Sequence, residues 1–162
     1  PKLIGCDSMN LWIEHKKKSL KRLIKKVDLF VANDQEARDL TGEHNLIKSA
    51  RAIRKLGQKY VVVKKGEHGV LFLCDQFMFS FPAYPVEHVL DPTGAGDTFA
   101  GGLMGYLTKV GKINQTNLKK ALLYATTMAS FNVEGFGMEV TSKLTLSKVN
   151  KRMNKLVNFV AI

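Results

Sequence analysis

Apolar and polar positions along the first third of the chain follow two alternating patterns. Short continuous apolar runs predict buried strands at 2–7, 28–34 and 59–66. Apolar residues at helical spacing between these runs predict helices at 14–27, 34–42 and 46–57. Strands and helices in strict alternation are typical of a parallel sheet whose two faces are covered, so we expect an α/β fold.

The pattern changes after residue 69. Two apolar runs joined by a turn at Asp75 and Gln76 predict an antiparallel hairpin at 69–83, and 86–90 reads as a further short strand. Helical spacing then predicts helices at 96–111, 117–135 and 144–160. No repeat and no Pro/Ser-rich linker interrupts this order, so the sequence predicts a single domain over 1–162.

Composition narrows the class of protein. The 162 residues are 45% hydrophobic, and 25 Lys and Arg against 14 Asp and Glu give a net charge of +11, which favours an anionic partner. Cys6 and Cys74 stand apart in apolar stretches, so we expect reduced thiols and a cytoplasmic location. No apolar run predicts a membrane span and no signal peptide is visible. The chain begins in strand-like sequence without Met, so we expect its natural start to lie upstream.

The stretch "LDPTGAGDTFAGGLMGYL", residues 90–107, carries the candidate chemistry. A strand that runs through Gly94 and Gly96 into a helix exposes backbone N–H groups at the helix N-terminus, which favours an anion site. Asp97 falls at the position expected for the N-cap, where it would either cap the helix, worth about 1 kcal/mol, or serve as a general base. Local chemistry alone favours the cap. Gly101 and Gly102 lie inside the predicted helix and indicate close packing against a neighbour.

Four segments together resemble a known family. "DPTGAGDTFAGGLMGYL" is similar to the C-terminal signature of the PfkB/ribokinase family of sugar and nucleoside kinases. "NDQEARDLTG" resembles that family's Asn-x-x-Glu segment, "VVVKKGEHGVLF" its nucleotide loop, and "ATTMASFNVEGFG" the helix and loop beside its adenine pocket. The resemblance covers about 3–159. It implies a ribokinase-like three-layer αβα fold, with a mostly parallel sheet and an antiparallel hairpin, in which the N-terminal part and the lid are missing.

The resemblance also implies an activity, the ATP-dependent phosphorylation of a hydroxyl on a sugar or nucleoside-like substrate by direct in-line transfer. It reverses the preference at Asp97, which would take the hydroxyl proton as general base. The backbone N–H groups of Gly94, Ala95, Gly96 and Asp97 would hold the charge that develops on the transferred group.

Further site residues are implied by the same resemblance. The nucleotide would contact Asn33, Lys64, Gly66, Glu67, Gly69, Asn132 and Gly135. Glu36 would order Mg²⁺ through water, and Asp91 and Thr93 would supply oxygen ligands to a monovalent cation such as K⁺. Structural alternatives stay open: a helix-dipole acid for Glu36, turn residues for Asn33, Asp91 and the glycines at 66 and 69, and a helix end for 132–135. Lys64 replaces the family's commoner Thr, and either reaches a phosphate or is a surface charge.

Partners follow from the same argument. We expect a small-molecule acceptor, no nucleic acid, no membrane, and a homodimer formed through the absent lid. The basic run at 16–26 fills the polar face of a helix and has no interleaved aromatic residues, so a solvated face is favoured over nucleic-acid binding. Asp7 and Asn10 either contact substrate or phosphates, or form a turn. The main alternative is an inactive nucleotide-binding fragment or interaction module, and a basic nucleic-acid-binding domain ranks third.

Overall fold

The computed structural model describes residues 2–160. These residues form two compact units, one ending at Phe81 and the other beginning at Pro82. The predicted single domain over 1–162 stays a prediction. None of the helices in the described part of the chain has the length and apolar character that crossing a membrane requires.

The first unit contains a mixed five-stranded sheet. Its strands, in spatial order, are β1 (Gly5–Asp7), β2 (Leu29–Asn33), β3 (Tyr60–Lys64), β4 (Val70–Leu73) and β5 (Met78–Phe81). The first three pair in parallel, and β4 pairs antiparallel with β3 and with β5. This arrangement confirms the predicted parallel strands and the hairpin. It also brings the carboxyl ends of β1, β2 and β3 to one edge of the sheet.

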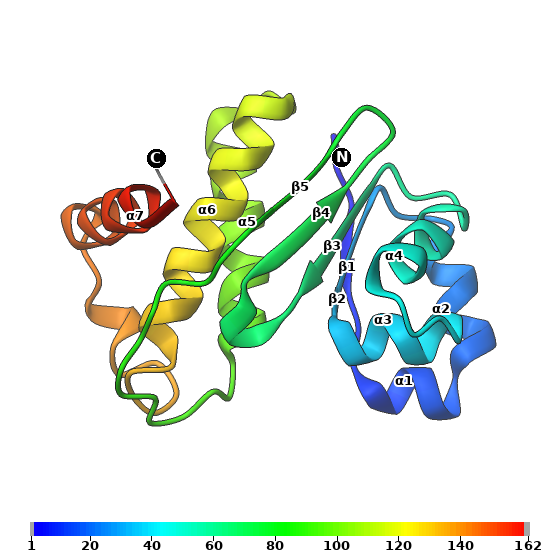
Figure 1. The fold of residues 1–162 in the computed structure, drawn as a ribbon, viewed down its shortest axis with the longest axis horizontal. Coiled ribbons are helices and arrows are strands. Elements are labelled where there is room, and N and C mark those ends of the chain that lie inside the picture. Colours follow the sequence, from blue (N-terminus) through cyan, green and yellow to red (C-terminus); the bar gives the residue numbers. More distant parts are fainter. Residues whose placement is uncertain (1, 161–162) are drawn as a thin grey trace. The chain divides into compact units, whose positions relative to one another are not determined.

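Helices α1 (Asn10–His15), α2 (Lys17–Ile24), α3 (Asp34–Thr41) and α4 (Leu46–Arg54) gather on one face of this sheet (Figure 1). Alternate residues of the strands, among them Phe30 and Val61, pack there against the apolar stripes of the helices in one buried cluster. The helix predicted at 14–27 is present as α2, but it is shorter and begins at Lys17. The backbone at Lys16 leaves the helical region, with φ −134° and ψ 28°, and separates α1 from α2.

Two predicted strands need correction. The strand predicted at 2–7 is shorter, and β1 lies at the edge of the sheet, where its residues are partly exposed and not buried. The strand predicted at 86–90 is absent. Instead, the backbone N–H of Leu90 donates to the carbonyl of Val133 at 2.8 Å, so this extended segment is held by the loop that follows a helix.

Both cysteines are free thiols, as predicted, with Cys6 on β1 and Cys74 just after β4. Burial raises the pKa of the Cys6 thiol, and the neighbouring Asp7 carboxylate adds to that effect. The Cys6 thiol is therefore not poised as a nucleophile near neutral pH.

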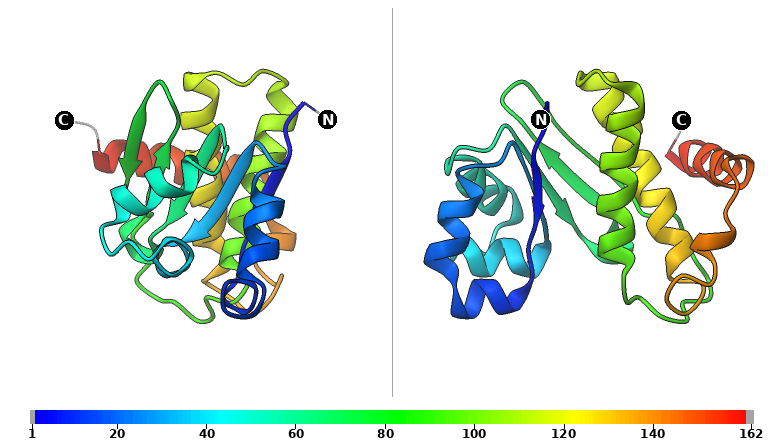
Figure 2. Two further views of the ribbon diagram at one scale, coloured as in Figure 1. Left: turned by 90° about the vertical axis from the view of Figure 1, so that its right-hand side faces the viewer. Right: turned by 180° about the vertical axis from the view of Figure 1, so that it is seen from behind.

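The second unit is helical, with α5 (Ala95–Val110), α6 (Gln115–Asn132), the short 3₁₀ turn η2 (Thr141–Lys143) and α7 (Leu146–Val160). Helices α5 and α6 lie side by side (Figure 2). A side-chain Cβ at Gly102 would stand 3.2 Å from the Cα of Ala125, which confirms the close packing predicted there. The same prediction is wrong for Gly101, which faces open space.

Candidate active site

The turn that starts α5 exposes two adjacent backbone donors. Gly94 is the N-cap in the left-handed region at φ +79°, and its carbonyl accepts the N–H of Thr98 at 2.8 Å. The N–H of Ala95 is already used, since it donates to Pro92 at 3.1 Å. The N–H groups of Gly96 and Asp97 have no acceptor among the described residues. Free amides at the first turn of a helix form an anion site. The N–H of Gly94, just before the helix, also has no acceptor among the described residues, so three of the four predicted donors are open to a ligand.

Asp97 does not cap the helix. It is the third residue of α5, not the N-cap, and no side chain caps this helix start. The predicted N-cap position is therefore wrong. The exposed Asp97 carboxylate lies in the first turn, on a residue whose own amide is one of the free donors. A group there can accept a proton from a hydroxyl beside the anion site.

Asn132, at the end of α6, forms hydrogen bonds with the turn that precedes α5. Its side-chain amide donates to the carbonyl of Thr93 at 2.8 Å, and its oxygen accepts the hydroxyl of Thr98 at 2.7 Å. The residue is only 4% exposed. The structure therefore places Asn132 against the turn before α5, with both ends of its amide engaged. Sequence reasoning missed Thr98, because a threonine one residue after the motif carries no distinctive signal.

Asp91 and Thr93 form a local turn. The Asp91 carboxylate accepts the backbone N–H of Thr93 at 2.9 Å, and this hydrogen bond, joined by one from the Thr93 side chain, lowers the pKa of Asp91. The turn role left open by the sequence is thus realised. The Thr93 carbonyl, which receives Asn132, retains a second lone pair for a cation.

Gly135 is fixed by a steric requirement. A Cβ at this position would stand 2.7 Å from a methyl carbon of Val140, closer than real contacts allow. The loop after α6 therefore needs glycine here to fold back on itself.

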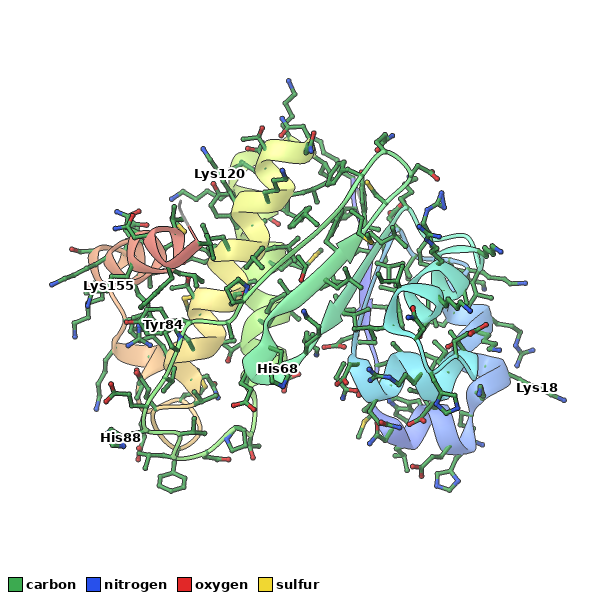
Figure 3. The ribbon with its side chains drawn as sticks, viewed as in Figure 1. Lys18, His68, Tyr84, His88, Lys120 and Lys155 are labelled. Atoms are coloured by element: carbon green, nitrogen blue, oxygen red, sulfur yellow. The ribbon has the colours of Figure 1, made fainter. Side chains whose placement is uncertain are left out.

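A cavity of about 450 Å³ lies in the second unit. Its walls come from the extended segment before the motif, the loop after α6, and α7: Tyr84, Pro85, Val86, Glu87, His88, Leu90, Glu134 and Arg152. Tyr84 and His88 can be followed along that segment in Figure 3. The Arg152 guanidinium donates to both carboxylate oxygens of Glu134 at 3.0 Å and stacks 3.5 Å from the ring centre of Phe131. These contacts hold Arg152 in the cavity wall, and no sequence pattern pointed to this arginine.

In the first unit, Asn33 and Glu36 form a reciprocal cap at the junction of β2 and α3. Glu36 accepts the backbone N–H of Asn33 at 2.8 Å, and Asn33 accepts that of Glu36 at 2.7 Å. Glu36 is only 5% exposed. Burial raises its pKa, and the Asn33 N–H and the charge of Lys64 oppose that rise. The capping role left open by the sequence is present, and it leaves one carboxylate oxygen without a hydrogen bond within the described residues.

Asp7 and Lys64 meet across the sheet at the same edge. The Lys64 ammonium lies 3.0 Å from one carboxylate oxygen of Asp7, and the other oxygen accepts the N–H of Ser8 at 2.8 Å. Lys64 is therefore not a free surface charge. The sequence suggested each residue separately but not their pairing, because they stand 57 positions apart.

The turn from β3 to β4 is built on two glycines with positive φ, Gly66 at +56° and Gly69 at +89°. It includes the short 3₁₀ helix η1 (Gly66–His68), and the N–H of Lys65 donates to the Gly69 carbonyl at 2.7 Å. Glu67 and His68 are highly exposed at its tip, where Figure 3 shows His68. The hairpin role of both glycines is confirmed, while the nucleotide role stays a prediction.

No cluster of three metal-ligating side chains occurs among residues 2–160. Mg²⁺ in phosphate-transfer sites is held by one or two carboxylates together with water and substrate phosphates. The carboxylate oxygen of Glu36 that makes no hydrogen bond fits such a shared site. Residues 2–160 contain no set of side chains that would hold the ion without water or substrate.

Comparison with known proteins matches the segments described above to one family. The family described as pfkB family carbohydrate kinase matches residues 6–143, most of the chain. The chain belongs to this family. A cytidine kinase from Thermococcus kodakarensis is 41% identical over 90 residues, which cover 54% of this chain and 32% of that protein.

Solved structures show the fold of this PfkB-family chain. Aminoimidazole riboside kinase from Salmonella enterica, complexed with aminoimidazole riboside and an ATP analog, superposes with a TM-score of 0.83 at 22% identity, covering 93% of this chain and 52% of that one. A putative ribokinase II from E. coli, in complex with ATP and Mg²⁺, gives 0.74 at 25% identity, covering 90% and 45%. The predicted ribokinase-like αβα fold is thus confirmed. The chain spans about a third to a half of the length of these relatives.

Proposed function

We propose that the chain carries the nucleotide-binding and catalytic part of a kinase that moves the γ-phosphoryl group of ATP to a hydroxyl of a sugar or nucleoside. The observation that carries this proposal is the start of α5, where two free backbone donors and an exposed carboxylate share one helical turn. Membership of the family described as pfkB family carbohydrate kinase supports the reaction class, and the similarity to a cytidine kinase agrees with it.

Asp97 acts as general base in this proposal. It accepts the proton of the attacking hydroxyl, while the amides of Gly96 and Asp97 stabilise the charge on the oxygens of the transferred group. Positioning and charge stabilisation account for most catalysis of phosphoryl transfer, so no covalent intermediate is needed. Asn132 acts indirectly, because its two hydrogen bonds hold the turn that presents these donors.

The first unit supplies contacts to the ATP phosphates and to Mg²⁺. Asn33 and the loop Gly66–Gly69, which includes Glu67, contact the nucleotide. The glycines at 66 and 69 leave the backbone groups of that loop accessible. Glu36 orders Mg²⁺ through its water shell with the oxygen that the cap leaves open. When bound, Mg²⁺ neutralises charge on the phosphates during transfer.

The cavity beside the loop after α6 is proposed as the nucleobase site. Its apolar wall, including Val86 and Leu90, suits a flat ring, and Glu134 and His88 supply polar edges. Gly135 lets the loop after α6 pass close to Val140, because any larger residue at this position would clash with the Val140 side chain. A monovalent cation such as K⁺ is proposed beside the turn at Asp91 and Thr93, where oxygen lone pairs remain.

Asp97→Asn tests the proposal most directly. The experiment measures ATP binding by calorimetry and phosphoryl transfer from ATP to a panel of ribose, fructose and cytidine. We expect Asp97→Asn to keep ATP affinity and to lose about 10²–10⁴-fold in turnover, the usual contribution of a general base. Glu43→Gln, an exposed acid between α3 and α4, serves as the matched control and should leave both quantities unchanged. Turnover retained by Asp97→Asn would remove Asp97 from the role of base.

A second candidate function is that of a nucleotide-binding module without transfer activity of its own. The partial coverage of the relatives favours it for this stretch of chain. The same experiment separates the two, because a module binds ATP with Mg²⁺ yet transfers no phosphate to any member of the panel.

A further inference from the structure

Lys64 occupies an unusual place for a lysine in this sheet. It ends β3, and its side chain crosses the end of β2 to reach Asp7 at the end of β1. The middle strand ends there with Asn33, which is the register partner of Lys64. This contact across the intervening strand β2 holds the ammonium at the carboxyl edge of the three parallel strands. Ligands of open α/β sheets bind outside that edge.

The ion pair is shielded from water. The Lys64 side chain is 19% exposed and the Asp7 side chain 26% exposed, although lysine is usually among the most exposed residues. Glu36, itself buried, is close enough for both charges to act on its carboxylate. The Lys64 ammonium therefore pairs with the Asp7 carboxylate and also acts electrostatically on that of Glu36. An anion that approaches this edge would find the positive charge fixed in one position.

The Lys64 ammonium has N–H donors that no described contact uses. Lysine carries three N–H donors, and the described contacts of Lys64 use one of them, on Asp7. Lys64 also directly precedes the glycine turn, so its ammonium and that loop are parts of one short segment. The next residue differs, because the Lys65 ammonium donates to the Ser80 hydroxyl on β5 at 3.2 Å and not to the strand-end cluster.

We propose that Lys64 binds the terminal phosphates of the nucleotide and that Asp7 is the positioning residue that holds its ammonium for them. This inference rests on the proposed function and adds a specificity to it: the pair makes affinity depend on the number of phosphates. Without Asp7, the flexible lysine stem loses its fixed partner, and its ammonium turns to the remaining carboxylate, Glu36.

Nucleotides with different numbers of phosphates test the role of Lys64. Dissociation constants of ATP, ADP, AMP and adenosine are measured by calorimetry on the 162-residue chain, with melting temperature as a second readout. Lys64→Met should weaken ATP and ADP binding about 10- to 100-fold, as expected for loss of a charged hydrogen bond, and leave adenosine binding unchanged. Lys64→Arg should recover most of the loss. Lys65→Met, the matched control, should leave all four constants unchanged.

A double-mutant cycle tests the role of Asp7. Asp7→Asn should weaken ATP binding in the wild-type background and cause no further loss in the Lys64→Met background, because the two residues act as one unit. Tighter ATP binding by Asp7→Asn would overturn the positioning role, since it would mean that Asp7 only repels phosphate. An equal loss in both backgrounds would also overturn it.

Failure of this inference differs from failure of the proposed function. If Lys64→Met lowers the melting temperature and leaves ATP affinity unchanged, the pair is purely structural, while the kinase proposal stands. If the wild-type chain binds none of the four compounds, the proposed function itself fails, and the inference fails with it.

Discussion

The carboxylate of Glu36 has two roles, one in the helix cap and one in the proposed Mg²⁺ site. As part of the cap it accepts the Asn33 N–H, and as the proposed Mg²⁺ residue it must be ionised. Burial opposes ionisation and raises its pKa above the ordinary 4.5. A raised pKa means that the folded state holds its proton to higher pH than the unfolded state does. Stability from this group is therefore fully present below pH 4.5 and is lost as pH rises through the folded-state pKa.

Replacing Glu36 by glutamine should remove that loss. Glutamine preserves the reciprocal cap and cannot ionise, so Glu36→Gln should melt at a higher temperature than wild type at pH 7. The difference should shrink as the pH falls towards 4.5 and below. Melting curves between pH 4 and 8 measure it, with Glu43→Gln as an exposed control. A destabilised Glu36→Gln at pH 7 would show that the carboxylate's partners outweigh its burial. Binding of Mg²⁺ and ATP should weaken in the same variant.

Asn132 links the end of α6 to the turn before α5 through two hydrogen bonds. Asn132→Leu should lower the free energy of unfolding by about 1–3 kcal/mol, because the Thr93 carbonyl and the Thr98 hydroxyl lose their buried partner. Urea unfolding measures this loss. Thr98→Val removes only one of the two bonds and should cost less. If both variants keep wild-type stability and ATP affinity, the support assigned to Asn132 is wrong.

At the scale of elements, the packing of α5 on α6 depends on which of two neighbouring glycines faces the partner helix. A Cβ at Gly102 would stand 3.2 Å from the Cα of Ala125, whereas one at Gly101 would face open space. Gly101→Ala should therefore stabilise the protein by about 0.5–1 kcal/mol through helix propensity. Gly102→Ala should destabilise it by about 1–3 kcal/mol, since the helices must separate. Urea unfolding of the two variants provides an internal control, and equal effects would contradict the packing.

The sequence predicted elements best where one local pattern decides them. The buried runs of β2 and β3 and the hairpin of β4 and β5 appear as expected. The break at Lys16 was missed because neither a glycine nor a proline marks it. The strand expected at 86–90 is absent because its backbone bonds with the loop after α6 instead of with a neighbouring strand. That outcome depends on a contact distant in sequence, which local apolar pattern does not contain.

The candidate site shows the same division. The motif at 94–97 predicted a glycine turn and the start of a helix, and both are present. The N-cap is Gly94 in the left-handed conformation, three residues before the cap position given to Asp97, and the helix begins at Ala95. The ion pair of Asp7 and Lys64 and the stacked Arg152 could not be predicted, since each joins residues on elements far apart in the chain.

At the scale of the whole molecule, the net charge of +11 attracts anions of any kind. This general attraction of anions is distinct from binding at the proposed nucleotide site. Lysines on α2 contribute to it from an exposed helix face, and Figure 3 shows Lys18 extending away from the ribbon. Charges on such a face are screened over about 8 Å at physiological salt, so they influence distant ligands mainly at low ionic strength.

Reversing two of these charges should separate the two effects. Lys16 and Lys18 lie at the start of α2, where acids complement the helix dipole, so Lys16→Glu with Lys18→Glu should keep the fold. The pair of changes lowers the net charge from +11 to +7. At about 150 mM salt, ATP affinity should stay within about threefold of wild type because the helix face is screened from the nucleotide site. Retention on duplex DNA, measured at low salt, should fall, and neither protein should be retained at about 150 mM salt. Retention of wild type at that salt, abolished by the two reversals, would favour a nucleic-acid-binding function for α2 over a solvated helix face.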